Sequence, residues 1–215
     1  MNISKRVQIL VLVLVPAGLL GMEHGSWTEQ DKTGNNILIE WHKFTDYQKL
    51  LELEKELIPV MIAAFSHQTL QTGVEDEKIA MATKWLQQQN AYEMSKCIQS
   101  QQAKCNISFV VTIKDVESTK ILGYAVFYLG PKFTQDCVVQ DCVTLDPLAI
   151  IPMAQGRGLS RKLVFSIFKL LPEARQIDLF VQRENTRAQA VFNRFGFVVD
   201  YEIRAGLKLK HIKKN

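Results

Sequence analysis

Six consecutive residues in the second half of the chain combine small, amide and cationic side chains in an order suited to binding an anion: Gln155, Gly156, Arg157, Gly158, Leu159 and Ser160. An apolar run precedes them and an amphipathic pattern over residues 159–171 follows, which predicts a strand, a glycine turn and a helix. The first N–H groups of a helix have no partner within it, and the helix dipole places partial positive charge there. Glycine lets an anion approach the backbone because it has no Cβ. The stretch is a candidate phosphate-binding loop, with a plain connecting loop as the simpler alternative.

Two familiar phosphate motifs do not fit this stretch. A P-loop requires Gly-Lys-Ser/Thr, which is missing. The dinucleotide fingerprint requires a third glycine, but position 161 is Arg. Asp178 stands at the start of the next predicted strand, whereas the acid that contacts a ribose stands at its end. Both interpretations are therefore excluded.

The loop resembles the pyrophosphate-binding motif of the GNAT superfamily of N-acetyltransferases. That motif reads Arg/Gln-x-x-Gly-x-Gly/Ala and follows a strand that usually ends near a proline. Gln155 and Gly158 match it, Pro152 stands where expected, and Ser160 replaces the last small residue. Serine is small enough to keep the turn.

A second block supports the same resemblance. Residues 185–197 resemble the family's Asn-x-x-Ala-x-x-(apolar)-Tyr-x-x-x-Gly-Phe helix, with Phe192 in the position of the tyrosine. Two motifs in the expected order are more specific than either alone. The resemblance extends from residue 37 to the C-terminus and is strongest over residues 148–197.

The resemblance implies an acyltransferase that uses acetyl-CoA as co-substrate and transfers its acetyl group to a primary amine of a small molecule or peptide. It implies that the pantetheine arm pairs with the strand before the loop, at Leu148, Ala149, Ile150 and Ile151. The loop residues 155–160 would bind the pyrophosphate, and Asn185 and Phe192 would contact the cofactor. For Asn185, a helix N-cap is the alternative role. The sequence contains neither a C-x-x-C motif nor paired histidines, so no metal site is expected.

Proton transfer has several candidate residues. An amine of pKa about 10 must lose a proton before it attacks a thioester. Asp141 and Asp146 lie on the predicted strand that leads into the site, and Glu184 precedes the second motif, so these three are candidate bases. A solvated carboxylate is the simpler interpretation of each. Phe192 cannot donate the proton that a tyrosine gives to the leaving thiolate, so packing is its default role and Tyr201 is an alternative donor.

The remaining pattern predicts one domain of the α/β class, with a mixed, mostly antiparallel sheet flanked by helices, which is the order of elements that the family implies. Strands are expected at residues 37–44, 107–113, 121–129, 137–151 (irregular at Asp146-Pro147), 177–181, 198–203 and 207–212, and helices at 47–64, 75–102, 159–171 and after Asn185. The basic C-terminal residues, from Lys208 to Lys214, are expected to form a solvated edge strand and tail.

The N-terminus divides into two further segments. Residues 1–22 are hydrophobic and resemble a secretory signal, a short membrane anchor, or a stretch upstream of a start at Met22. Residues 23–36 are polar and are expected to be a linker before the domain at 37–215. Because acetyl-CoA is made in the cytoplasm, we expect a cytoplasmic protein; membrane anchoring or export is the alternative, and only residues 7–22 suit a membrane.

Composition narrows the possible partners. The 215 residues are 47% hydrophobic and carry a net charge of +4, which suits a domain with a substantial core and an anionic ligand. The sequence has no basic stripe with interleaved aromatic residues, so no nucleic-acid partner is expected. The four cysteines are expected to be reduced thiols. Two other functions stay open: a catalytically silent acyl-CoA sensor, and a membrane-associated or exported protein that uses the fold without acetyl-CoA.

Overall fold

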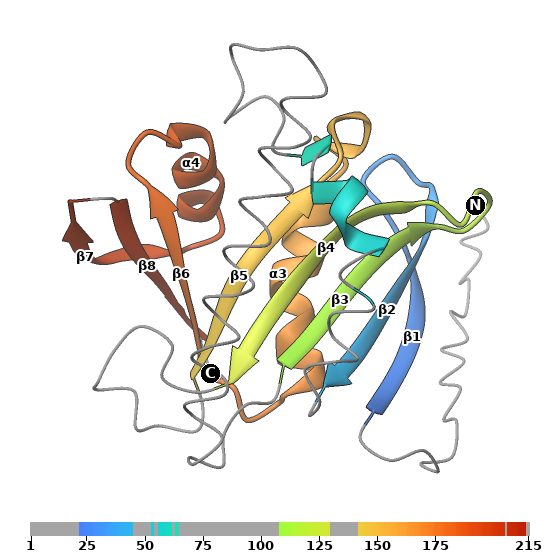
Figure 1. Cartoon of the computed structure of the whole chain (residues 1–215), viewed down its shortest axis with the longest axis horizontal. Coiled ribbons are helices and arrows are strands. Elements are labelled where there is room, and N and C mark those ends of the chain that lie inside the picture. Colours follow the sequence, from blue (N-terminus) through green and yellow to red (C-terminus); the bar gives the residue numbers. More distant parts are fainter. Residues whose placement is uncertain are drawn as a thin grey trace, which may run out of the picture.

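The computed structural model describes residues 22–44, 53, 56–61, 63–64, 108–129, 142–204 and 206–213. Within them, eight strands form one sheet in the order β1-β2-β3-β4-β5-β6-β8-β7 (Figure 1). The elements are β1 (Met22–Gln30), β2 (Asn36–Phe44), β3 (Ser108–Asp115), β4 (Ile121–Leu129), β5 (Cys142–Ile150), η1 (Pro152–Ala154), α3 (Leu159–Leu170), β6 (Gln176–Gln182), α4 (Thr186–Arg194), β7 (Val198–Ile203) and β8 (Gly206–Ile212). Only β5 and β6 pair in parallel. The predicted mixed, mostly antiparallel sheet is confirmed.

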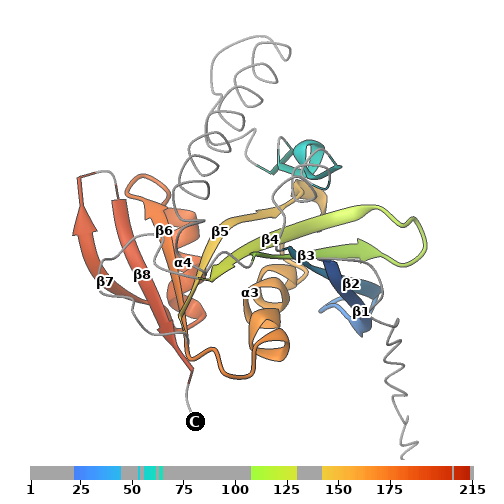
Figure 2. The same cartoon turned by 60° about the horizontal axis from the view of Figure 1, so that its bottom comes forward.

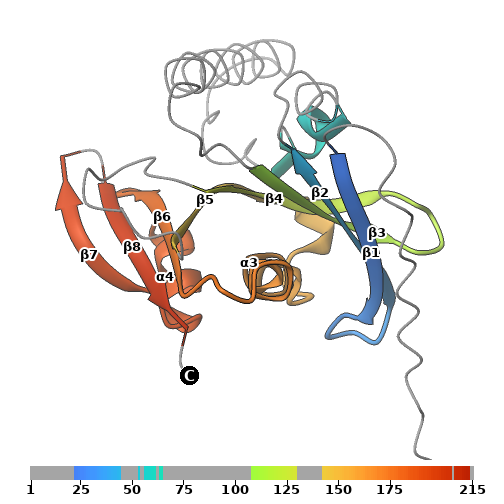
Figure 3. The same cartoon turned by 90° about the horizontal axis from the view of Figure 1, so that it is seen from below.

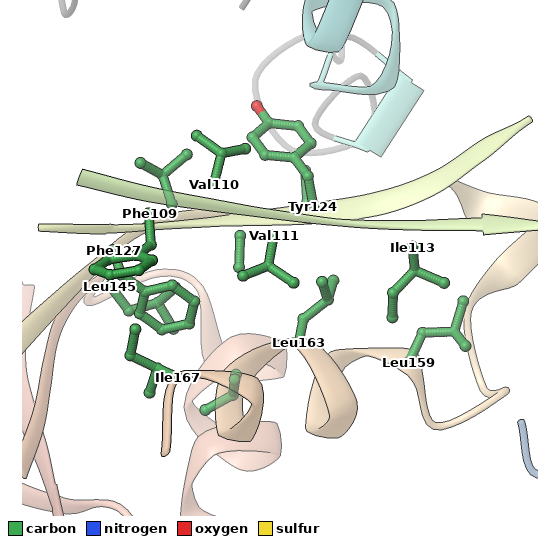
Figure 4. Close-up of a cluster of buried hydrophobic side chains, with 14 of the residues drawn as sticks. Phe109, Val110, Val111, Ile113, Tyr124, Phe127, Leu145, Leu159, Leu163 and Ile167 are labelled. Carbon is green, nitrogen blue, oxygen red and sulfur yellow. The ribbon is translucent and has the colours of Figure 1, made fainter. Parts of the chain in front are cut away.

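The core lies on both faces of the central strands. Val111 and Ile113 of β3 point to the face that α3 covers, whereas Val110 of β3 and Tyr124 of β4 point to the opposite face (Figure 4). All four side chains are buried. Alternating residues on a strand point to opposite faces, so burial on both sides explains the continuous apolar runs of β3 and β4.

Helical segments cover the two faces of the sheet. Helix α3 lies on the concave side of the curved sheet, between β1–β2 and β6–β8 (Figure 3). Its buried residues are Leu159, Leu163, Val164, Ser166 and Ile167. Residues 56–61, which are helical, lie across the sheet from α3 (Figure 2) and contribute buried Leu57, Val60 and Met61.

The expected linker at residues 23–36 is instead mostly a strand. β1 pairs with β2 along its whole length, from Met22↔Phe44 to Gln30↔Asn36, and residues 31–35 form the turn. Sequence pattern missed β1 because it has no apolar alternation. As an edge strand it is stabilised by backbone pairing and by ion pairs of its polar side chains, such as Glu29 with Lys162.

The expectation of a solvated C-terminal edge strand is also wrong. β8 lies between β6 and β7, and β7 is the edge strand. Lys208 is only 5% exposed, and its Nζ lies 2.8 Å from Oδ2 of the equally buried Asp178 on β6. Burial opposes the charge of Lys208, but the hydrogen bond and the attraction of Asp178 outweigh it and raise the pKa of the lysine.

Some expectations fall outside the described residues. They are the predicted helix at 75–102, most of that at 47–64, Asp141, and the hydrophobic segment 1–21. Among the residues that the structure does describe, no helix is long and apolar enough to cross a membrane.

Candidate active site

The parallel strands β5 and β6 pair at one end only. Their register runs from Cys142↔Gln176 to Leu145↔Leu179, after which the strands diverge (Figure 1). On its other edge β5 remains paired with β4 as far as Gly123↔Ile150. Because backbone groups alternate between the two edges of a strand, half of those in the last residues of β5 face the gap. Among the described residues, none pairs with this edge of Leu148, Ala149 and Ile150, the predicted pantetheine-binding residues.

The edge of β5 is irregular at two places, one at Ile151 and one at Asp146 and Pro147. Ile151 lies just past β5, and its N–H donates to the carbonyl of Leu122, 3.0 Å away. At the closed end of the gap, the β4–β5 register shifts at Asp146 and Pro147, as the sequence predicts. Such a bulge bends a strand and redirects its side chains, and bulges are frequent next to active sites.

The glycine loop follows at the open end of the gap. Gly156 and Gly158 have φ angles of 81° and 80°, a left-handed conformation that favours glycine. Gly158 is the N-cap of α3, so it offers no side-chain acceptor, and the first turn of α3 contains no acidic residue. The loop therefore delivers a helix N-terminus whose N–H groups receive no side-chain cap, at the end of the sheet where the gap opens.

Gln155 connects three elements around the mouth of the gap. Its Nε2 donates to the carbonyl of Ile150 at 3.3 Å, and its Oε1 accepts from Nη2 of Arg187 at 2.5 Å. Arg187 lies in the first turn of α4, so this side chain ties the end of β5 to both helix N-termini. Sequence reasoning singled out Gln155 but missed Arg187, although Arg187 stands inside the second motif.

Arg157 does not point freely into solvent, since the turn between β1 and β2 holds it. Its Nε donates to Oδ2 of Asp31 at 2.5 Å, and its carbonyl accepts from the N–H of Lys32 at 3.1 Å. Its Nη2 is buried and has no acceptor among the described residues. Asp31 and Lys32 were missed because their segment reads as a linker.

A hollow of about 480 Å³ lies beside Gly158, between β1 and α3. Four cationic side chains line it, namely Lys32, Arg161, Lys162 and Lys169. Glu29 accepts from both Lys162 and Lys169 at 2.5 Å. Burial opposes its ionisation, but these two hydrogen bonds outweigh burial and lower the pKa of Glu29 to about 2. The surroundings of the α3 N-terminus are thus basic, in keeping with an anionic ligand.

A family model matches the part of the chain that contains this loop. The model of the acetyltransferase (GNAT) family matches residues 74–197, more than half of the chain and including both motifs. The chain belongs to the acetyltransferase (GNAT) family. It is therefore an acyltransferase, and binding of the cofactor by the glycine loop stays a prediction.

Solved structures agree with this GNAT fold. The PaiA N-acetyltransferase of Thermoplasma acidophilum, solved with coenzyme A, matches with a TM-score of 0.55 and 14% identity, covering 81% of this chain and 99% of that one. A GNAT acetyltransferase of Listeria monocytogenes matches with a TM-score of 0.54 and 14% identity, covering 86% and 99%. No curated protein sequence matches the chain.

In this GNAT domain the second motif forms α4. The two residues of the motif that were predicted to contact the cofactor, Asn185 and Phe192, both have structural roles. Oδ1 of Asn185 accepts from the N–H of Ala188 at 3.0 Å and caps the helix. Phe192 is 7% exposed, with its ring 6.3 Å from that of Phe195 and 5.3 Å from that of Phe197. These contacts account for both side chains without a ligand, and contact with the cofactor stays a prediction for each.

The candidate bases of the GNAT site differ in position. Asp146 directly follows Leu145, the last residue of β5 that pairs with β6, so it stands at the closed end of the gap. Glu184 is exposed in the turn between β6 and α4. Asp141, the third candidate, lies outside the described residues. Which of the three accepts the proton stays a prediction.

Proposed function

We propose that the protein transfers an acetyl group from acetyl-CoA to a primary amine of a small molecule or peptide, by direct attack of the amine on the thioester. The observation that carries this proposal is the open edge of β5 leading straight into a glycine loop and an uncapped helix N-terminus. A ligand with an extended amide-containing arm and a pyrophosphate is complementary to that arrangement. Such a site needs no metal, and since acetyl-CoA is made in the cytoplasm, we assign the reaction to that compartment.

Each part of the site then has a task. The backbone of residues 148–150 pairs with the pantetheine amides, and the N–H groups of Gly158, Leu159 and Ser160 bind the pyrophosphate. Acetyl-CoA supplies an activated carbonyl carbon. Backbone N–H groups on the open edge stabilise negative charge on the carbonyl oxygen as the C–N bond forms and the C–S bond breaks.

The proton acceptor and the proton donor can be inferred from the positions of the residues around the gap. Asp146 accepts the proton that the ammonium must lose, directly or through water. The leaving thiolate needs no acid from position 192, because a thiol of pKa about 8.5 is a tolerable leaving group. Tyr201 is a poor alternative donor. It lies on β7, three strands from β5, which is about 14 Å at the usual spacing between strands.

Calorimetry and a turnover assay test the two halves of the proposal separately. We expect acetyl-CoA to bind with a micromolar dissociation constant, about −8 kcal/mol. We expect CoA thiol to be released only when a suitable amine from a broad panel is present. Asp146→Asn should lower kcat by about 10² with little change in acetyl-CoA affinity, whereas the exposed Glu184→Gln should change neither. A loss of kcat in Glu184→Gln alone would transfer the role of base to Glu184, and one in Asp141→Asn alone to Asp141.

The position of Phe192 favours a second candidate function, a silent acyl-CoA sensor. The residue that would protonate the leaving thiolate has no hydroxyl, and it packs against Phe195 and Phe197. If the chain is an enzyme, Phe192→Tyr should keep or raise kcat, by up to about 10² with general-acid help. If the wild type and Phe192→Tyr both bind acetyl-CoA but acetylate no amine, the sensor replaces the enzyme.

A further inference from the structure

We propose that the β1–β2 hairpin is a working part of the cofactor site, with Asp31 as the residue that positions Arg157 and the glycine loop. The proposal rests on the proposed cofactor site and extends it to a segment outside both family motifs. In this view the hairpin is a brace that holds the pyrophosphate loop in its binding conformation before the ligand arrives.

Asp31 divides its two carboxylate oxygens between two tasks. Oδ1 accepts from the N–H and Oγ1 of Thr33, at 2.8 and 2.7 Å, and from the N–H of Asn35 at 3.1 Å, which fixes the turn between β1 and β2. Oδ2 accepts from Nε of Arg157. The carboxylate is fully buried, so water does not compete for either oxygen. One residue therefore joins the geometry of the turn to that of the loop.

The backbone and a neighbouring side chain reinforce this junction. The N–H of Lys32 donates to the carbonyl of Arg157, so the hairpin holds both the side chain and the main chain of that residue. The aliphatic chain of Lys32 lies over Gly158, and a Cβ built on Gly158 would come within 2.9 Å of it. The hairpin thus contacts the loop at two consecutive residues.

A second anchor holds β1 along the body of α3. Trp27, Glu29 and Asp31 alternate in sequence, so they point to the same side of the hairpin. Glu29 accepts from Lys162 and Lys169, one and three turns into the helix, and Nζ of Lys169 lies 5.0 Å from the ring of Trp27. The hairpin is therefore fixed to the helix as well as to the loop, and it acts as a rigid support rather than a loose neighbour.

The loop has a physical need for such a support. Arg157 stands between two glycines, and glycine loses more conformational freedom on ordering than any other residue. A loop ordered in advance binds its ligand more tightly, because the ligand does not have to offset that entropy. With Nε and the carbonyl of Arg157 both held by the hairpin, the residue between the two glycines is fixed, and the loop keeps one backbone conformation for the pyrophosphate.

Asp31→Asn isolates the contact with Arg157. Asparagine keeps an oxygen for the three hydrogen bonds of the turn but replaces the acceptor for Arg157 with an N–H₂ group. We expect acetyl-CoA to bind about tenfold more weakly by calorimetry, and KM for acetyl-CoA to rise with kcat unchanged. The matched control is Glu40→Gln, which breaks the ion pair between Glu40 of β2 and Lys114, away from the loop. It should leave affinity unchanged, even if both variants melt at a lower temperature.

A double-mutant cycle separates positioning from general destabilisation. If Asp31 acts through Arg157, then Asp31→Asn should have no further effect on acetyl-CoA affinity in an Arg157→Gln background. Additive losses would overturn the proposal. So would tighter binding by Asp31→Asn, which would mean that the carboxylate mainly repels the phosphate.

Hydrogen exchange of the unliganded protein keeps this test independent of the proposed function. In Asp31→Asn the backbone amides of residues 156–160 should exchange about tenfold faster than in the wild type, while those of α4 stay unchanged. Failure of the wild type to bind acetyl-CoA would refute the proposed function, and the exchange rates would still show whether Asp31 orders the loop. Equal exchange in the mutant and the wild type would refute the brace.

Discussion

Two helices begin at the same end of the sheet, after the parallel strands β5 and β6, and their N-termini are built in opposite ways. Asn185 is the N-cap of helix α4, and its side-chain oxygen accepts from the N–H of Ala188, three residues further along. Helix α3 begins at Gly158, which has no side chain to offer, and its first turn holds no acid. One N-terminus is capped by a side chain, and the other has no side-chain cap among the described residues.

The difference is what the proposed anion site at α3 requires. A side-chain cap stabilises a helix by about 1 kcal/mol, and α3 forgoes that contribution. It compensates with partners from elsewhere, since Glu29 of β1 accepts from Lys162 and Lys169 on its exposed side. These ion pairs with a distant strand add to the core packing of α3, and they leave the end of the helix without a side-chain cap.

Gly158→Val should have the largest effect on the open N-terminus. The residue has a φ of +80°, and a Cβ there would come within 2.9 Å of the Lys32 side chain, so the loop would have to shift at the proposed phosphate site. We expect acetyl-CoA affinity, measured by calorimetry, to fall at least tenfold, or about 1.4 kcal/mol. The control is Gly196→Ala after α4, which has a φ of +87° and whose Cβ would make only an ordinary contact, 3.5 Å, with His211. It carries a similar backbone strain away from the hairpin and the glycine loop, so equal losses of affinity in the two variants would contradict the assignment.

Ser160→Asp should change stability and affinity in opposite directions. A carboxylate in the first turn of α3 interacts favourably with the helix dipole, by about 0.5 kcal/mol. The same charge would repel a pyrophosphate, and we expect the affinity for acetyl-CoA to fall about tenfold. Thermal unfolding and calorimetry on one preparation check both signs. A variant that melts higher and binds as well as the wild type would show that the anion does not lie at this helix end.

Substitutions of Asn185 should affect the capped N-terminus mainly through stability. Asn185→Ala removes the acceptor for Ala188 and should cost about 1 kcal/mol, or about 3 °C in melting temperature. Asn185→Asp keeps the cap and should restore stability. If Asn185 also contacts the cofactor, Asn185→Asp should bind acetyl-CoA more weakly than the wild type despite its restored melting temperature. Equal affinity would leave Asn185 as a cap alone.

Motif and periodicity were enough to predict the strands of the core, α3, α4 and the closing hairpin, because these elements bury apolar residues at regular spacing. They were also enough to find Gln155 and the glycine loop. They could not find β1, which pairs with β2 but whose side chains Trp27, Glu29 and Asp31 contact residues more than 120 positions away. Nor could they reveal that Lys208 is buried, since its partner Asp178 lies on another strand. Ion pairs between distant segments leave no local pattern in a sequence.

Acid should remove the external support of α3 while leaving the cap of α4 intact. Burial opposes the ionisation of Asp31, but hydrogen bonds from Thr33, Arg157 and Asn35 outweigh it and lower its pKa from 3.8 to about 2. Glu29 behaves alike, with a pKa near 2 against an ordinary 4.5. Because the folded state binds these protons more weakly than the unfolded chain, the stabilisation is complete above the ordinary pKa values. It is lost as the pH falls through about 2.

The two N-termini should respond differently to pH, and this difference gives the test with the smallest expected effect but the highest selectivity. The gap in melting temperature between the wild type and Asp31→Asn should be constant above about pH 5 and shrink between about pH 4 and pH 2.5. The gap between the wild type and Asn185→Ala should stay constant over the same range, because an amide does not titrate. Circular dichroism at a series of pH values measures both. If the two gaps shrank together, the loss would reflect general acid unfolding, and the contrast between an externally supported helix and a self-capped one would not hold.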